Sequence, residues 1–300
     1  MKRKVIKQAN QAYTITLPID WVRRNNVDKN RELEVTEEEK TLIIKNDRDV
    51  QSSSANLKVE DLDKRNLTRH ITALYAKGID EINIESKKDI TSDLSWGLSN
   101  TIGYALLCKK NDIFQIKDIG GTNYSNLDEI FKRVFQMVLA FYESAINDVF
   151  GEQKETLEGL QQRDREINKF CLFLQRAINK MSYPNQIKGR ALFTYSFEIE
   201  RIGDEVTRFW RANIKHKIKK TNDIKKLAEK SLESLGEAFE LYYQFNSKKN
   251  EDLYSTREKI REESMKIKNN DKYAIRLVRH VVKISEDAAD LSHLTLMINL

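Results

Sequence analysis

The hydrophobic pattern divides the chain into a short N-terminal region of alternating residues and a long C-terminal region of helical periodicity. From Leu127 onward, hydrophobic residues recur every three or four positions, which predicts amphipathic helices packed against one another. Six such segments follow in two sets of three. We therefore expect tandem three-helix bundles over residues 122–218 and 219–300.

The first 45 residues predict short strands around one helical turn. The alternating runs are Val5–Gln8, Tyr13–Leu17, Leu33 with Val35, and Thr41–Ile44. Pro18 is favourable at the first position of a helix, in which Ile19, Trp21 and Val22 can be buried. Because a piece this small rarely buries enough surface to be stable alone, we expect it to dimerise.

The middle of the chain, residues 56–121, alternates between helical and extended patterns. The predicted elements are a linker at Asn46–Ala55, a helix at Leu62–Tyr75 ended by Gly78, a strand at Ile79–Ile84, a helix at Leu94–Cys108 and a strand at Ile113–Lys117. This alternation predicts a crossover that packs helices on a small parallel sheet. Gly120-Gly121 lacks the spacing of a phosphate-binding loop. We interpret this unit as a connector or dimerisation element.

Composition is that of a soluble helical protein. Charged residues make up 33% of the chain, there are only two prolines, and no apolar run approaches the roughly eighteen residues that span a bilayer. The start at Met1 lacks the apolar stretch of a signal peptide, so we expect a cytoplasmic protein without membrane insertion. Cys108 and Cys171 are single and far apart, which excludes a disulfide framework and favours small core residues.

Positive charge is concentrated at the N-terminus. Up to Arg31 there are eight Lys or Arg against Asp20 and Asp28, a local excess equal to the net charge of +6 of the whole chain. A dimer would double this field and bring it to a nucleic-acid backbone. The candidate phosphate contacts are Lys2, Arg3, Lys4, Lys7, Arg23 and Arg24. The alternative is a dimerisation module whose basic side chains are only solvated.

Two further polar sets are more ordinary. A basic joint follows the third helix of the C-terminal region, and we interpret it as a solvated face. It consists of Arg211, Lys215, Lys217, Lys219 and Lys220. The four histidines, His70, His216, His280 and His293, are scattered along the chain and point to no metal site.

The third long helix carries two stripes of different character. The apolar stripe is Tyr195, Ile199, Ile202, Val206 and Phe209. Beside it lie Ser196, Glu200, Gly203, Asp204 and Thr207 at the same spacing. Glycine costs roughly 1 kcal/mol relative to alanine inside a helix, and a carboxylate at a core is costly unless it is paired or binds a metal. We therefore expect something to occupy the space beside Gly203.

Asp164 interrupts the apolar seam of the preceding helix. Together with Glu200 and Asp204 it would form an oxygen-rich site for a hard cation such as iron(III), magnesium or calcium. The alternative is a ladder of i,i+4 ion pairs, Arg201 with Glu205 and Asp204 with Arg208, each contributing about 0.3 to 0.5 kcal/mol.

The last helix carries a weaker version of the acidic pattern. When Lys283–Glu286 is aligned on Arg201–Asp204, Val282 takes the place of Glu200. Glu286 and Asp290 remain as candidate metal ligands. We therefore expect tighter metal binding by the first repeat than by the second.

The pentapeptide Glu200–Asp204 resembles the signature of the PhoU family of phosphate-uptake regulators. Asp164–Asn168 resembles the acidic motif of the neighbouring helix in that family, with an amide at its last position. The run Val5–Val35 resembles AbrB-type swapped-hairpin domains. These resemblances imply metal held by E/D-x-x-x-D motifs on tandem three-helix repeats, and an intertwined N-terminal dimer of a kind that often binds DNA.

These patterns together indicate a mainly α protein with an AbrB-like domain at 1–50, a connector at 56–121 and a PhoU-like domain at 122–300. The expected function is phosphate-responsive regulation of phosphate uptake through DNA binding, without catalysis. DNA, a homodimer or higher homo-oligomer, and a phosphate-transporter component are the expected partners. The alternatives are a nucleoid-structuring protein and a metal-dependent phosphoester hydrolase, for which no general base can be named.

Overall fold

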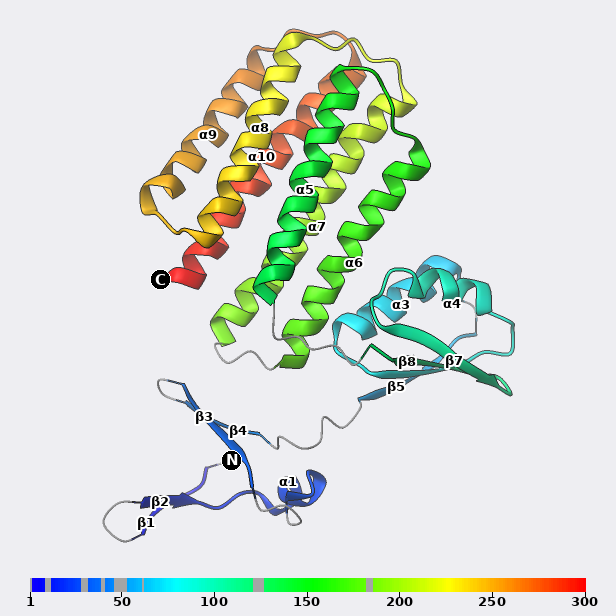
Figure 1. Ribbon diagram of the computed structural model, residues 1–300, viewed down its shortest axis with the longest axis vertical. Coiled ribbons are helices and arrows are strands. Elements are labelled where there is room, and N and C mark those ends of the chain that lie inside the picture. The colour runs from blue at the N-terminus through cyan, green and yellow to red at the C-terminus, as the bar shows by residue number, and fades with distance from the viewer. Residues whose placement is uncertain are drawn as a thin grey trace. The chain divides into compact units, whose positions relative to one another are not determined.

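The computed structural model describes residues 2–8, 12–27, 32–38, 41–45, 53–60, 62–120, 127–181 and 186–300. Within these residues the chain is mainly helical, with small β-sheets confined to its first 120 positions (Figure 1). This confirms the prediction of a mainly α fold. The chain divides into two compact units, Met1–Ser53 and Ser54–Leu300.

The N-terminal unit consists of two antiparallel hairpins and a short helix. Strand β1 (Val5–Gln8) pairs with β2 (Ala12–Ile15), and β3 (Glu34–Glu38) pairs with β4 (Thr41–Lys45). The strands agree with the alternating runs of the sequence. Helix α1 (Ile19–Arg24) lies between the hairpins in the chain. Pro18 is its N-cap and has extended backbone angles, so it precedes the first helical position predicted for it.

Apolar side chains of this unit are largely exposed within one chain. Helix α1 buries none of its residues, and Ile19 is 56% exposed, so the predicted burial of its apolar face is wrong for a single copy. Within the described residues of this unit, each two-stranded hairpin forms a single layer, which leaves its apolar side chains uncovered. The exposed set is Val5, Ile6, Tyr13, Ile15, Ile19, Val35 and Leu42.

The second unit begins with a four-stranded mixed sheet. Its order is β5 (Ser54–Lys58), β6 (Glu81–Glu85), β8 (Ile113–Asp118) and β7 (Tyr104–Lys110). Strands β5 and β6 are parallel and are connected through α3, whereas β6–β8 and β8–β7 are antiparallel. The prediction of a parallel sheet therefore holds for only one pair, because β7 and β8 form a hairpin that turns at Asn111 with φ of 55°.

Two predicted boundaries in this region are wrong. The helix predicted over Leu94–Cys108 is a short helix, α4 (Thr91–Leu98), followed by strand β7. Gly103 separates them at φ of 88°, a conformation that a helix cannot continue through. Consequently Cys108 is exposed on β7, while Cys171 is buried as predicted. Ser54 and Ala55 belong to β5 rather than to a linker, since their strand is defined by pairing with β6.

Helix α3 (Lys64–Ala76) and α4 lie on the same face of the sheet (Figure 1). Asp63 caps α3 by accepting from the backbone N–H of Asn66 at 2.8 Å, and Gly78, at φ of 92°, follows its end as predicted. Period-two alternation places one side of each strand under these helices. The buried side chains are Ile82, Ile84, Phe114 and Ile116.

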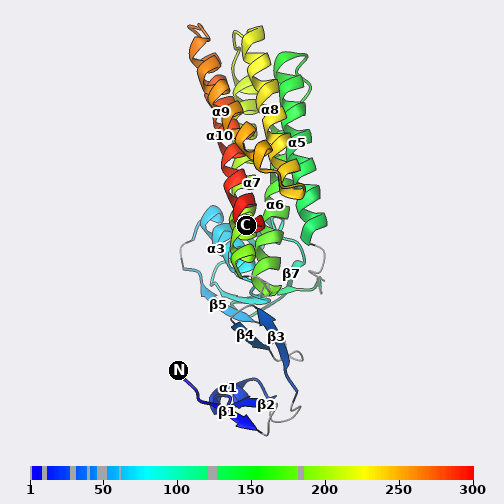
Figure 2. The ribbon, with the colours of Figure 1, turned by 90° about the vertical axis from the view of Figure 1, so that its left-hand side faces the viewer.

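The remaining residues form six long helices that agree with the six predicted segments. They are α5 (Leu127–Phe150), α6 (Leu157–Met181), α7 (Gln186–Lys215), α8 (Asn222–Tyr243), α9 (Ser247–Lys266) and α10 (Lys272–Asn299). Helices α5, α6 and α7 pack together, as do α8, α9 and α10. Contacts of α7 with α10 and of α5 with α8 join the two sets (Figures 1 and 2).

One continuous hydrophobic core runs through all six helices. The apolar stripe of α7 is buried in it, as the spacing predicted. Phe135 of α5 and Phe239 of α8 stack with ring centroids 4.0 Å apart, which ties the two sets of helices together. Across the described residues, none of the helices combines the length and apolar character needed to cross a membrane.

Arg176 of α6 fastens the helices to the α/β region. Its side chain is fully buried, and Nη2 donates to Asp80 at 2.8 Å and to Asp118 at 2.7 Å. Nη1 donates to the backbone carbonyls of Tyr75 and Ile79 at 3.1 and 2.6 Å. The planar fork of an arginine suits this combination of contacts to two carboxylates and two backbone carbonyls.

Candidate functional site

Three predicted acidic residues come together where α6 meets α7. Asp164 comes from α6, and Glu200 and Asp204 lie one turn apart on α7, at the margin of the buried face. Asp164 Oδ1 accepts a hydrogen bond from Thr207 Oγ1 at 2.7 Å. The second stripe of α7 therefore faces α6, as its position beside the apolar stripe predicted.

The acids in this cluster oppose one another's ionisation. Burial raises the pKa of Glu200 to about 7, and the charges of Asp204 and Asp164 add to the rise. Burial also raises the pKa of Asp164; the hydrogen bond from Thr207 opposes this rise, and Asp204 adds to it. Such a cluster favours either a proton or a cation at neutral pH.

The space beside Gly203 is taken up by an apolar neighbour. A Cβ atom built on Gly203 would lie 3.4 Å from Ile167 Cγ2 of α6, which is ordinary van der Waals contact. Ile167 is therefore what occupies the gap expected at this glycine. The close approach of α6 and α7 accommodates Gly203 without strictly requiring it.

One of the two predicted ion pairs on α7 is present. Arg208 Nη2 lies 2.7 Å from Asp204 Oδ2, which confirms that pair. The pairing of Arg201 with Glu205 is wrong, because Arg201 bonds Glu198 at 2.8 Å and Glu205 bonds Arg208 at 2.5 Å. Glu205 lies on the buried side of α7, whereas Arg201 is about half exposed and reaches back along the helix surface.

A buried pair of a histidine and a glutamate, His280 and Glu205, was not predicted from the sequence. His280 of α10 is 3% exposed, and its Nδ1 lies 2.7 Å from Glu205 Oε2. Burial opposes ionisation of Glu205, but hydrogen bonds from His280 and Arg208 outweigh burial and lower its pKa. Helical spacing could have predicted that His280 is buried, because His280 lies between Leu277 and Ile284 on the apolar stripe of α10.

The acids predicted for the second repeat lie apart from this cluster. Arg261 of α9 binds Glu286, with Nη2 2.6 Å from the carboxylate, and Asp290 is exposed. The buried acid of α10 is instead Asp287, which is paired with Lys283. The structure thus engages Glu286 in an ion pair and brings neither it nor Asp290 to α6.

The donor set at α6 and α7 suits a hard cation chemically, because it offers carboxylate oxygens. As the side chains stand, however, Arg208 holds Asp204 and Thr207 holds Asp164. In the part of the chain that the structure describes, no group of three or more His, Cys, Asp or Glu residues is arranged to hold a metal ion. A cation would bind Asp204 in competition with Arg208, which holds its Oδ2.

The predicted phosphate contacts of the N-terminal unit are all solvent-exposed. Lys7 lies on β1, and Arg23 and Arg24 end α1. Arg24 Nε donates to the backbone carbonyl of Asp20 at 3.2 Å, which directs its guanidinium along the helix. Exposure is compatible both with contact to a phosphate backbone and with simple solvation.

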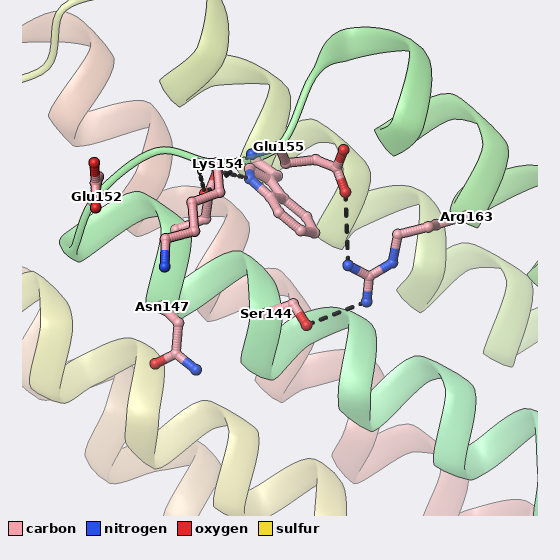
Figure 3. A pocket seen from close by; sticks show the side chains of 8 residues that line it. Ser144, Asn147, Glu152, Lys154, Glu155 and Arg163 are labelled. Atoms are coloured by element: carbon pink, nitrogen blue, oxygen red, sulfur yellow. Dashed lines mark hydrogen bonds and ion pairs between the residues drawn. The ribbon is translucent and has the colours of Figure 1, made fainter.

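A separate pocket of about 380 Å³ lies beside the loop between α5 and α6 (Figure 3). Asp148 at its wall accepts from Trp210 Nε1 at 2.5 Å and from the backbone N–H of Glu155 at 3.3 Å. Arg163 donates to Ser144 Oγ at 3.2 Å and lies 3.7 Å from the Glu155 carboxylate. These polar groups bind one another and hold the loop in place.

No protein-family model and no curated protein matches this chain.

Proposed function

We propose that the protein is a phosphate-responsive regulator that binds DNA through its N-terminal unit and holds a metal ion in its helical region, without catalysis. The observation that carries this proposal is the N-terminal unit, which combines exposed apolar faces with exposed basic side chains.

A second copy of the chain is the proposed cover for the apolar residues of the hairpins. Tyr13 is 69% exposed, Leu42 65% and Val5 62%, and these side chains come from both hairpins. Single hairpins are marginal in water, and large exposed apolar side chains mark a surface that is covered in use. An intertwined dimer of AbrB type would supply the missing second layer from the partner's hairpins.

DNA is the proposed ligand of this dimer. Two copies would present two sets of the six basic candidates on a compact unit, and the summed field would attract a phosphate backbone. The acidic residues that follow, among them Glu34 and Glu37, are exposed on β3. For this reason we propose that the contacts are made by the segment that runs from Lys2 through β1 and by α1.

The helical region supports a tandem PhoU-like arrangement of two three-helix repeats. With Lys283–Glu286 aligned on Arg201–Asp204, Asp287 falls on Glu205, and both are buried acids. Each interacts with the other repeat's helix, Glu205 with His280 and Asp287 with Arg201 at 3.7 Å. Equivalent positions with equivalent environments are what an internal repeat produces.

Asp164, Glu200 and Asp204 are the proposed metal ligands. Burial, together with their mutual repulsion, raises the pKa of Glu200 to about 7, and a bound cation would relieve the repulsion. A hard ion such as iron(III), magnesium or calcium would supply the positive charge that these oxygens lack. Its proposed role is to fix the packing of α6 on α7. The helical region would then have two states, one with the metal bound and one without it.

Replacing both Arg23 and Arg24 by alanine should weaken binding to duplex DNA and reduce its dependence on salt. Each phosphate contact that is lost should lower the slope of log K against log salt by about one. The slope is measured by fluorescence anisotropy of a labelled duplex at a series of salt concentrations.

The matched control is Lys217→Ala with Lys219→Ala, which removes the same charge from the basic joint. This control should keep the wild-type slope. An unchanged slope in the arginine variant, with a reduced slope in the control, would transfer the DNA contact from the N-terminal unit to the joint.

A further inference from the structure

A second site lies between α7 and α10, in a pocket of about 270 Å³. Two of the scattered histidines line this pocket, as does part of the joint that we interpreted as a solvated face. Its basic and imidazole side chains are Arg208, Arg211, Lys215, His216, Arg276 and His280. Lys217 and Lys219 of the same joint are exposed, as predicted.

Basic side chains from one side of α7 and from the start of α10 line the pocket together. Arg208, Arg211 and Lys215 recur at intervals of three and four along α7, and so share one side of it. The ring of His216 stacks on that of Tyr273 with centroids 3.9 Å apart, which anchors the end of α7 beside the start of α10. The cationic groups are thereby held close together.

Acidic groups balance only part of this charge. Arg208 binds Asp204 and Glu205, and Glu205 also binds His280. Arg211 interacts with the charge of Asp164 without forming an ion pair with it. Among the described residues, Arg211, Lys215 and Arg276 form no ion pair within 4.0 Å, and Arg211 Nε is buried without a hydrogen-bond partner. A buried donor left unpaired is unfavourable, so this arrangement favours an acceptor that is not part of the chain.

We propose that this pocket binds a small tetrahedral oxyanion of the phosphate class. Guanidinium groups bind such anions through paired N–H donors, and two arginines beside Arg208 are available for this. The pocket is slightly smaller than the roughly 300 to 1,000 Å³ typical of drug-sized ligands, which favours a small ion. The dipole of α7 disfavours an anion at its C-terminal end, whereas the dipole of α10 favours an anion at its N-terminal end. Because the two effects oppose each other, the side chains determine whether an anion binds.

Arg208 connects this pocket to the acidic cluster. The same guanidinium lines the pocket and holds Asp204. An oxyanion that draws on Arg208 weakens that ion pair and leaves Asp204 available to a cation. Oxyanion and cation should then bind with positive coupling, equal in both directions; this last step rests on the proposed function, whereas the oxyanion site does not.

Isothermal titration of the full chain with inorganic phosphate, in chloride buffer without divalent cations, tests the site. The wild type should bind with a measurable dissociation constant, and Arg211→Gln with Arg276→Gln should weaken binding at least tenfold, since a hydrogen bond to a charged group contributes about 1.5 to 3 kcal/mol. Lys217→Gln with Lys219→Gln removes equal charge nearby and should change the constant by less than about threefold. If the double variant does not fold, Arg276→Gln alone replaces it in the titration, because Arg276 is exposed.

Parallel titrations with sulfate and a nucleoside monophosphate distinguish the sources of the oxyanion. Binding of free phosphate or sulfate supports a free ion, and tighter binding of the nucleotide supports a phosphoryl group on a larger ligand. No binding by the wild type below about 10 mM of any of the three overturns the site. Equal weakening in the lysine control also overturns it, because the effect would then be general charge.

The coupling is tested by repeating the phosphate titration with saturating magnesium. Magnesium should tighten phosphate binding several-fold in the wild type and leave Asp204→Asn unchanged. Phosphate binding that is insensitive to magnesium overturns the coupling alone, and leaves the oxyanion site standing.

Discussion

Arg176→Ala should lower the free energy of unfolding by about 3 to 5 kcal/mol, the range measured when one partner of a buried charged network is removed. The change removes the buried guanidinium from the carboxylates of Asp118 and Asp80, while Lys180 stays paired with Asp80. It also removes one of the donors to each of two backbone carbonyls, those of Tyr75 and Ile79. Because these contacts join α6 to the α/β region, the sheet should lose hydrogen-exchange protection before the long helices do. Chemical denaturation and hydrogen exchange measure the two effects.

Arg176→Lys should lose most of the same free energy, since a point charge cannot bond two carboxylates and two carbonyls as a guanidinium does. Arg190→Ala on the exposed side of α7 is the control and should stay within about 0.5 kcal/mol of wild type. If Arg176→Ala costs no more than this control, the buried network does not hold the two regions together.

Glu200→Gln with Asp204→Asn should empty the helical region of metal. The wild type, reconstituted with iron(III), magnesium or calcium and passed through gel filtration, should retain about one ion per chain. The double variant loses two of the three carboxylates. The protein then offers a hard cation too few oxygen ligands to replace the water molecules that the cation gives up on binding. Elemental analysis of both proteins measures the difference.

Metal retention should also fall as the pH falls through about 7. Cation and proton compete for Glu200, whose pKa of about 7 lies well above its ordinary 4.5. The cation-free protein shows the converse. A carboxyl whose pKa is raised by folding stabilises the folded state most at a pH below its pKa in the unfolded chain. The free energy of unfolding should therefore decline between about pH 4.5 and 7, by up to roughly 3 kcal/mol. Bound metal should remove this decline.

The corresponding change on α10, Glu286→Gln with Asp290→Asn, is the control and should leave metal retention nearly intact. Arg261 already engages Glu286 there, and Val282 replaces the leading carboxylate. Equal metal content in wild type and the Glu200 variant would place the ion elsewhere. No metal in either protein would return Glu200 and Asp204 to an ion-pair role on the helix surface.

Sequence periodicity predicted the six long helices because each buries a stripe repeated over many turns. The stripe of α7, from Tyr195 to Phe209, is buried throughout. The same logic failed at Leu94–Cys108, where an apolar run short enough for either element was broken by the backbone of Gly103. Strand β5 was missed because its pairing with β6 is distant in sequence and its side chains, such as Ser54 and Asn56, are polar.

The acidic cluster was predictable in part for the same reason. Spacing along one helix placed Glu200 beside Asp204, and the interrupted seam of α6 indicated Asp164. Contacts between helices lie outside such a pattern. Nothing in local spacing connects Glu205 with His280, or Arg176 with Asp118, because each pair depends on how distant helices and strands pack.

A map of chromatin immunoprecipitation in native cells, at high and at low phosphate, tests the account most directly. A phosphate-responsive DNA-binding regulator should occupy a limited set of sites near phosphate-uptake genes, with occupancy that changes with phosphate. Arg23→Ala with Arg24→Ala should erase those sites. Uniform coverage of the chromosome, unaffected by phosphate, would contradict the account and favour a nucleoid-structuring protein.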